Sequence, residues 1–146
     1  MMESKDLKAL LEQRTATMKQ FVEGHEPICC YAIFRADLGM TPGKMAAQCG
    51  HAFDEVIMKS SGDEILAYKG TGHGTKIIMY VKNEHQLVRC YEEAKALGIT
   101  TALVVDRGHV IPNTMFTGAP ILTAVGIGPV KRSLAAPITK RCTMVQ

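Results

Sequence analysis

An unbroken apolar run over residues 28–34 leads into a short polar turn and then a helix start, and this unit constrains the fold more than any other feature of the chain. A short apolar run with β-branched and aromatic members is typical of a buried strand. Thr41 offers a side-chain oxygen that can cap a helix, and Pro42 suits the first helical position because its backbone angle is preset. The sequence therefore predicts a buried strand followed directly by a helix that begins near residue 42.

Lys44 falls in the first turn of this predicted helix, where a cation is unfavourable. The N-terminus of a helix carries partial positive charge and favours anions by roughly 0.3–1 kcal/mol. Local preferences are most often broken at functional sites. Gln48 and His51 follow Lys44 on one face at helical spacing, while apolar residues recur on another face. Two interpretations stay open here: a site for an anion or acyl substrate at the helix start, or an amphipathic helix whose polar side is only solvated.

The remaining chain alternates between strand-like and helix-like segments. Further strands are expected over 75–81, 101–105 and 121–127, and further helices over 64–69, between Asn83 and Gly98, and over 130–136 before Pro137, with an extended tail over 142–145. This alternation indicates an α/β protein. Ligand chemistry is then expected near the carboxyl ends of parallel strands, which is where Asp106 falls.

Length and composition indicate one domain behind an N-terminal helical extension. A domain of this size buries roughly two thirds of its unfolded surface, which is enough for one core. Residues 1–27 carry apolar residues at helical spacing among charges of both signs, and predict an amphipathic helix that packs on the domain, 28–146, or on a second subunit. No apolar cluster in that extension is long enough for a signal peptide or a membrane span. We expect a cytoplasmic protein without a membrane segment.

The five cysteines and the glycine-rich segments point to no cofactor. The cysteines show neither CxxC nor paired Cys/His spacing, which favours reduced thiols and predicts no metal site. Glycines at 70–74 precede a strand rather than follow one, and 39–45 is one residue short of a phosphate loop and lacks its Ser/Thr. A nucleotide-binding domain stays open as an alternative on these glycines alone.

The second half of the chain has no acidic side chain between residue 107 and its end. The basic residues there are Arg107, Lys131, Arg132, Lys140 and Arg141. Such a segment could face a polyanion or form a solvated basic surface, and both interpretations stay open.

Residues 35–52, RADLGMTPGKMAAQCGHA, resemble the signature of the type 2 peptidyl-tRNA hydrolase family. Three further stretches follow in the order that the family shows: 74–81, 94–99, and Asp106-Arg-Gly108 with 123–129 behind it. The resemblance covers about Tyr31 to Gln146. It implies a three-layer α/β sandwich with a four-stranded mixed sheet and helices on both faces.

The resemblance also implies hydrolysis of the ester that joins a peptide to the 3′ ribose of a transfer RNA. This acyl transfer to water needs an aligned or deprotonated water, donors for the developing oxyanion and contacts to the RNA backbone. It requires neither metal nor organic cofactor. Peptidyl-tRNA is the implied partner, and a homodimer is possible because dimers are known within the family.

Carried over by position, the resemblance assigns Lys44, Asp106 and Thr123 to catalysis, with Gln48 and His51 from the helix signature. Lys44 could stabilise the oxyanion or hold a phosphate. Asp106 could orient water, act as a base, or only pair with Lys44. His51 could be the base, because histidine titrates near neutral pH, or a hydrogen-bonded structural residue. The residues expected to contact RNA are Arg107, Lys131, Arg132 and Lys76.

The segment after Asp106 departs from the family pattern. The family reads Asp-Ala-Gly followed by Arg-Thr-Gln, whereas this chain reads Asp106-Arg-Gly108 followed by His109-Val-Ile111, and the loop before Gly118 is longer. Arg107 could bind phosphate or compete with Lys44 for Asp106. A second hypothesis follows from this departure: a non-catalytic adaptor with the same fold that binds RNA or a protein.

Overall fold

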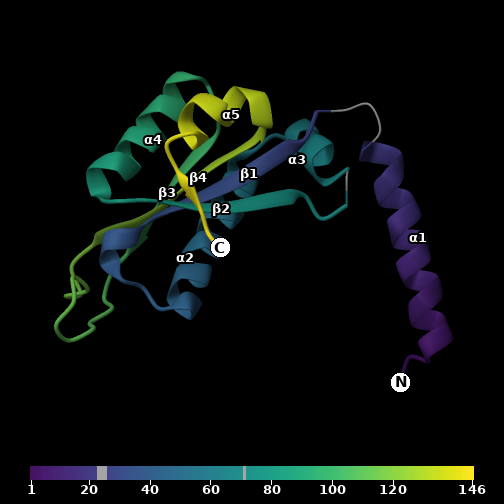
Figure 1. Ribbon diagram of the computed structural model, residues 1–146, viewed down its shortest axis with the longest axis horizontal. Coiled ribbons are helices and arrows are strands. Elements are labelled where there is room, and N and C mark those ends of the chain that lie inside the picture. The colour runs from purple at the N-terminus through teal and green to yellow at the C-terminus, as the bar shows by residue number, and fades with distance from the viewer. Residues whose placement is uncertain (23–25, 71) are drawn as a thin grey trace.

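Figure 1 shows the computed structural model of the chain, which describes residues 1–22, 26–70 and 72–146. The described residues form one five-stranded sheet in the order β3-β4-β1-β2-β5. The strands are β1 (Ile28–Arg35), β2 (Thr75–Val81), β3 (Thr101–Asp106), β4 (Ile121–Lys131) and β5 (Thr143–Met144). The strand predicted over 28–34 and the two that follow it are therefore confirmed to within a residue, and β4 runs four residues further than expected.

Helices cover both faces of the sheet, which confirms the predicted three-layer sandwich (Figure 1). They are α1 (Ser4–Val22), the 3-10 turn η1 (Ala36–Leu38), α2 (Pro42–Lys59), α3 (Gly62–Lys69), α4 (Glu84–Ala96) and α5 (Arg132–Thr139). One core cluster joins α2 and α3 to the sheet through Cys49, Val56 and Tyr68. The opposite cluster joins α4 and α5 to the other face through Leu87 and Ile138.

Three further sequence expectations differ from the structure. The sheet has a fifth strand among the described residues, because the tail expected to be merely extended pairs antiparallel with β2 through Met144 and Thr143. Helix α3 begins at Gly62 rather than residue 64, since Ser61 and Glu64 form a reciprocal capping box. Helix α5 continues through Pro137, whose missing N–H removes only one hydrogen bond from a short helix.

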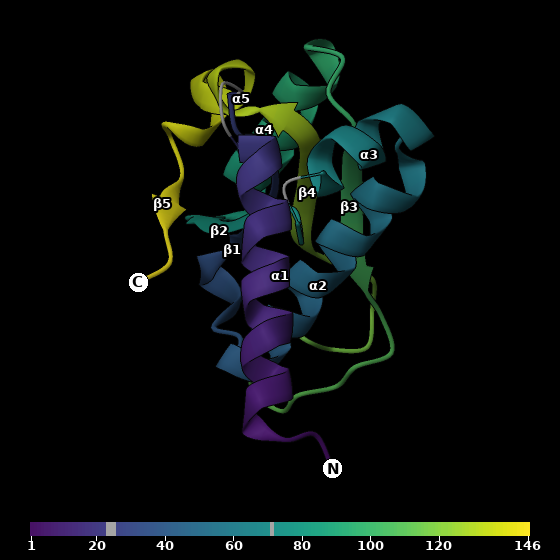
Figure 2. The ribbon, with the colours of Figure 1, turned by 90° about the vertical axis from the view of Figure 1, so that its right-hand side faces the viewer.

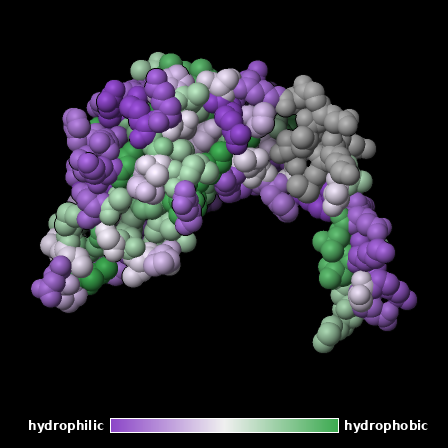
Figure 3. All heavy atoms as spheres, viewed as in Figure 1, coloured by the Kyte–Doolittle hydropathy of each residue, from purple (hydrophilic) through white to green (hydrophobic). Residues whose placement is uncertain are grey.

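Helix α1 extends away from the sheet and its covering helices (Figures 1 and 2). Apolar side chains run along one side of α1 and charged ones along the other (Figure 3), and Leu7, Leu10 and Leu11 are exposed. Residues Ser4–Val22 of the extension therefore form a helix whose described apolar side chains gather on one side. Across the described ranges, we find no helix of sufficient length and apolarity to span a bilayer.

The strand directions bring three carboxyl ends to one edge of the sheet. Strand β1 is parallel to β2, and β4 is antiparallel to both β1 and β3, so β1, β2 and β3 run in the same direction. Helix α2 lies close over this layer because Gly126 of β4 has no side chain. A Cβ at Gly126 would lie 2.5 Å from the carbonyl oxygen of Ala52. This close approach holds the middle of α2 against β4.

Candidate active site

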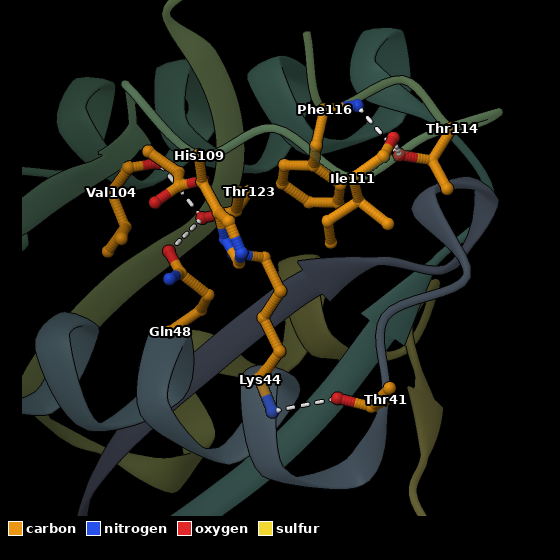
Figure 4. Close-up of polar contacts among 10 residues, drawn as sticks. Thr41, Lys44, Gln48, Val104, His109, Ile111, Thr114, Phe116 and Thr123 are labelled. Atoms are coloured by element: carbon orange, nitrogen blue, oxygen red, sulfur yellow. Dashed lines mark hydrogen bonds and ion pairs between the residues drawn. The ribbon is translucent and has the colours of Figure 1, made fainter. Parts of the chain in front are cut away.

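The start of α2 carries the first functional side chain. Thr41 caps the helix by accepting a hydrogen bond from the backbone N–H of Lys44 at 3.2 Å, and Pro42 occupies the first turn, as predicted. Buried Cys49 and Ala52 fix the rotation of the helix against the sheet. With that face inward, Lys44 and Gln48 project toward the ends of β3 and β4 (Figure 4).

Lys44 and Asp106 form a partly buried ion pair at the carboxyl edge. Lys44 Nζ lies 3.3 Å from Oδ2 of Asp106, and the two side chains are 11% and 18% exposed. Asp106 is the last residue of β3 and shares the α2 face with Val104, two positions earlier in the strand. At this depth the attraction is screened less than on an open surface, while one side of the pair stays accessible.

The loop after Asp106 adds two groups to this ion pair. Lys44 Nζ forms a hydrogen bond with Nδ1 of His109, and the same Nδ1 is 3.8 Å from Asp106 Oδ2. The ring of Phe116 lies beneath the cation, with its centroid 4.4 Å from Nζ, and is 2% exposed. An ammonium group over an aromatic face at this distance gains a cation–π attraction.

The loop between β3 and β4 closes as a short hairpin. Gly108 N–H donates to the carbonyl of Gly118 at 2.8 Å, and Gly118 N–H donates to the carbonyl of His109 at 3.1 Å. Val110 and Thr117 form an antiparallel bridge beyond these bonds. His109 is therefore held by backbone hydrogen bonds on a strand-like segment.

A second, neutral group of side chains lies one turn of α2 further along from Lys44. Thr123 Oγ1 is 2.6 Å from Oε1 of Gln48 and 3.2 Å from the carbonyl oxygen of Val104 (Figure 4). Thr123 is fully buried and Gln48 is 6% exposed. A β-bulge explains the direction of the threonine: Val104 pairs with Ala124 and Val105 with Leu122, so Thr123 is the extra residue and turns toward α2.

The hydroxyl of Thr123 has one proton and two oxygen neighbours. It can donate to only one of them at a time. If the Gln48 amide turned its NH₂ group toward Thr123, the hydroxyl could accept from Gln48 and donate to Val104, and both contacts would be satisfied. Either arrangement joins α2, β3 and β4 through neutral hydrogen bonds.

Arg35 fixes the same end of β4 from the opposite side. This 5%-exposed residue donates to both carboxylate oxygens of Asp37 at 2.8 Å, to Glu84 at 3.0 Å and to the carbonyl of Leu122 at 3.3 Å. The hydrogen bonds from Arg35 lower the pKa of Asp37 below its ordinary value. The arginine of the signature thus holds the backbone immediately before Thr123.

Of the five residues predicted for catalysis, the structure brings four together. Lys44 meets Asp106, and Gln48 meets Thr123, one helical turn further along α2. His51 is exposed, and within the part of the chain that the structure describes no hydrogen bond or ion pair links it to the other four. Its role as a base therefore has no support from the geometry.

The four residues predicted to contact RNA do not form one surface. Arg107 is exposed beside Asp106, and among the described ion pairs none joins these two residues. In the sheet, Lys131 of β4 lies opposite Ile28, and Lys76 of β2 lies opposite Cys30, both at the start of β1. The eight residues of β1 span roughly 25 Å. Lys76, Lys131 and Arg132 therefore lie at the end of the strands opposite to the ion pair.

The remaining basic residues and the cysteines add no group to the site. Arg141 is neutralised by an ion pair with Glu93 on α4. Burial raises the pKa of the Cys30 and Cys49 thiols to about 11, which makes them poor nucleophiles at neutral pH. Over the described ranges, we find no group of three or more His, Cys, Asp or Glu side chains that could hold a metal ion.

Sequence reasoning did not assign His109 or Phe116 to the catalytic site. Both lie in the segment where the loop is longer than the family pattern, which was the only available signal. The sequence placed the emphasis on Arg107, whose side chain points to solvent, whereas the residue two positions later enters the site.

The chain is thus a small α/β sandwich domain. It carries a lysine–carboxylate pair where the parallel strands of its mixed sheet end. Residues 28–145 match the family described as Peptidyl-tRNA hydrolase PTH2, and the chain belongs to that family.

Several relatives support this assignment. The chain is 37% identical over 98 residues to a peptidyl-tRNA hydrolase of Methanothermobacter thermautotrophicus, covering 66% of this chain and 81% of that protein. It is 34% identical over 111 residues to one of Methanocaldococcus jannaschii, covering 73% and 90%. A probable peptidyl-tRNA hydrolase 2 of Dictyostelium discoideum is 32% identical over 112 residues, covering 74% of this chain and 50% of that protein. The chain thus spans half the length of the Dictyostelium protein and most of the other two.

Proposed function

We propose that this chain hydrolyses the ester bond of peptidyl-tRNA and releases the peptide and free tRNA for reuse in translation. The observation that carries the proposal is the partly buried contact between Lys44 and Asp106, which are 62 positions apart in the chain. The contact joins the α2 signature to the end of β3, where the family resemblance expects the reaction. The names of the relatives agree with this substrate.

In the proposed reaction Asp106 acts on the water. Its carboxylate orients the water and accepts a proton as the water oxygen attacks the ester carbonyl. The carbonyl oxygen then carries a negative charge in the tetrahedral intermediate. When the intermediate collapses, the bond to the ribose oxygen breaks, and that oxygen takes the proton from Asp106.

Lys44 stabilises the charge that develops on the carbonyl oxygen. Its ammonium is paired with Asp106 and lies over Phe116, so an N–H can be directed at the oxyanion without a large rearrangement. Gln48 and Thr123 hold α2 against β3 and β4 beneath it. Their burial suits a positioning role rather than direct contact with water.

RNA contacts are proposed at two places. Arg107 is exposed beside the ion pair and can bind a phosphate near the 3′ end. Lys76, Lys131 and Arg132 lie roughly 25 Å away and would meet a more distant part of the RNA. Two separated contacts suit a substrate much larger than its reacting ester.

The direct test is incubation of the purified chain with an N-blocked aminoacyl-tRNA. Repeated turnover, with release of the acyl group and free tRNA, is the expected result. The adaptor hypothesis expects RNA binding that weakens steeply with salt but no turnover. Binding without hydrolysis under conditions that support a known peptidyl-tRNA hydrolase would contradict the proposed activity.

We also propose that residues 28–146 form the catalytic domain, that 1–27 are an extension to it, and that the protein works in the cytoplasm. The exposed leucines of α1 support a homodimer formed through that helix. Sedimentation should show a dimer that dissociates in a Leu7→Ser, Leu11→Ser double variant. A monomer at all concentrations would contradict this arrangement.

A further inference from the structure

We propose that His109 is a positioning residue that aims the ammonium group of Lys44 at the substrate. The inference rests on the proposed function, since it concerns how the same site works. It assigns a role to a residue that lies where this chain departs from the family pattern, on the longer loop after Asp106.

The proposed role of His109 requires one particular hydrogen-bonding arrangement of the imidazole. An ammonium group has three N–H donors and no acceptor, so Nδ1 of His109 must accept the hydrogen bond. The proposal accordingly places the ring proton on Nε2 and leaves Nδ1 as the acceptor. A protonated ring would offer no acceptor and would place a second positive charge beside Lys44.

Two acceptors fix the rotation of the ammonium group. Lys44 Nζ can donate one N–H to Asp106 and another to His109, and its tetrahedral geometry then sets the direction of the third. With Asp106 alone, the group could rotate about that single hydrogen bond. A preset donor costs no reorganisation when the oxyanion forms, which is the condition for effective electrostatic stabilisation.

The loop is built to hold His109 in this place. Gly118 N–H bonds to the His109 carbonyl at 3.1 Å, and Gly108 N–H bonds to Gly118 at 2.8 Å. The buried ring of Phe116 packs beside the imidazole, with the two centroids 6.0 Å apart. The centroid of the Phe116 ring is also 4.4 Å from Lys44 Nζ. One side chain of the loop therefore contacts both Lys44 and His109.

The charged groups that face His109 come from two elements. Lys44 approaches from α2 (Figure 4), and Asp106 lies at the end of β3 with Oδ2 3.8 Å from Nδ1. The imidazole itself is 48% exposed, which leaves room for substrate to approach the same cation. The histidine therefore acts through Lys44. It supplies the second hydrogen-bond acceptor of the ammonium group from the solvent-exposed side of the site.

Kinetics of matched variants test this role. His109→Ala should lower kcat for an N-blocked aminoacyl-tRNA about tenfold, the scale of one hydrogen bond to a charged group, with little change in KM. His109→Asn should recover most of the rate because its amide oxygen can replace Nδ1. His109→Gln should not, because its polar end reaches the position of Nε2. His85→Ala removes an exposed histidine from α4 and should match the wild-type protein.

Two results would overturn the inference. One is a His109→Ala variant with the kcat of the wild-type protein; the other is an equal loss in the Ala, Asn and Gln variants, which would indicate only a damaged loop. Lys44→Met separates this failure from that of the proposed function. If Lys44→Met is inactive while His109→Ala is unimpaired, only the role of His109 fails; if both keep full activity, the assignment of Lys44 fails as well.

A spectroscopic measurement gives a readout that does not depend on activity. In ¹⁵N spectra of the full chain at neutral pH, Nδ1 of His109 should give the resonance of an unprotonated, hydrogen-bonded nitrogen. The resonance should move in Lys44→Met, while that of His85 stays. An unchanged His109 resonance in that variant would contradict the contact.

Discussion

The site has an ionic half and a neutral half. Both draw on α2 and β3, but they differ in chemistry and exposure. The ionic half consists of Lys44, Asp106 and His109, and each of its side chains reaches solvent. The neutral half consists of Gln48, Thr123 and the Val104 carbonyl, with both side chains buried. One turn of α2 and two residues of β3 separate the halves.

This difference assigns different tasks to groups that the sequence placed in one set. A partly exposed cation and carboxylate can meet water and an ester without opening the fold. A hydroxyl with no exposed surface is suited to hold the backbone, and its loss leaves polar neighbours unpaired in the interior. The ionic half should control rate, and the neutral half should control stability.

The largest effect is expected from Asp106→Asn. The amide keeps the size of the side chain but removes the charge that orients Lys44 and the group that accepts a proton from water. Single-turnover hydrolysis should slow by about 10²–10³-fold or more, the range seen when one transition-state contact is removed. Asp54→Asn, an exposed position on α2, is the matched control and should leave the rate unchanged. Equal rates in the two variants would remove Asp106 from the mechanism.

A smaller effect, of another kind, is expected from Thr123→Val. The substitution keeps the shape and removes the hydroxyl, so Gln48 and the Val104 carbonyl lose a buried partner. The free energy of unfolding should fall by about 1–3 kcal/mol, and Tm by about 2–4 °C for each kcal/mol. Thermal unfolding checks this, with Thr123→Ser as the variant that keeps the hydroxyl. A Thr123→Val protein as stable as the wild type would contradict the supporting role of the neutral half.

The smallest effect is expected from Asp37→Asn, which removes the charge that pairs with Arg35. Because Arg35 lowers the pKa of Asp37 in the folded protein, the pair stabilises the fold above the unfolded pKa of about 4 and loses that contribution as pH falls through the lower, folded value. The variant should be less stable than the wild type at pH 7, and the difference should shrink in acid. Denaturant unfolding at several pH values measures this. A gap that stays constant below pH 4 would show that the charge of Asp37 is not the cause.

Much of the fold could be predicted from the amino-acid sequence. The Ile28 strand, the Thr41 cap and the Asn83 cap follow from local chemistry, because each signal lies within a few residues of the element that it starts. The position of Asp106 at a strand end followed in the same way. The pairing of Lys44 with Asp106 rested on the family resemblance, and the structure places the two in contact.

The rest depended on tertiary contacts that leave no local pattern. The two-residue strand β5 is too short for a hydrophobic period, and the bulge that turns Thr123 toward α2 depends on its pairing with β3. His51 shares a helical face with Lys44, but spacing cannot tell how far along the helix the site extends. His109 reaches Lys44 only because of how the hairpin closes.

The division of tasks between the two halves is tested by comparing Lys44→Met with Thr123→Val in one experiment. Single-turnover hydrolysis of an N-blocked aminoacyl-tRNA and thermal unfolding are measured on both, at a temperature where both are folded. If the ionic half sets the rate and the neutral half the stability, Lys44→Met loses nearly all activity and keeps its Tm, whereas Thr123→Val keeps most activity and unfolds at a lower temperature. An active Lys44→Met protein, or a Thr123→Val protein that is stable but inactive, would contradict it.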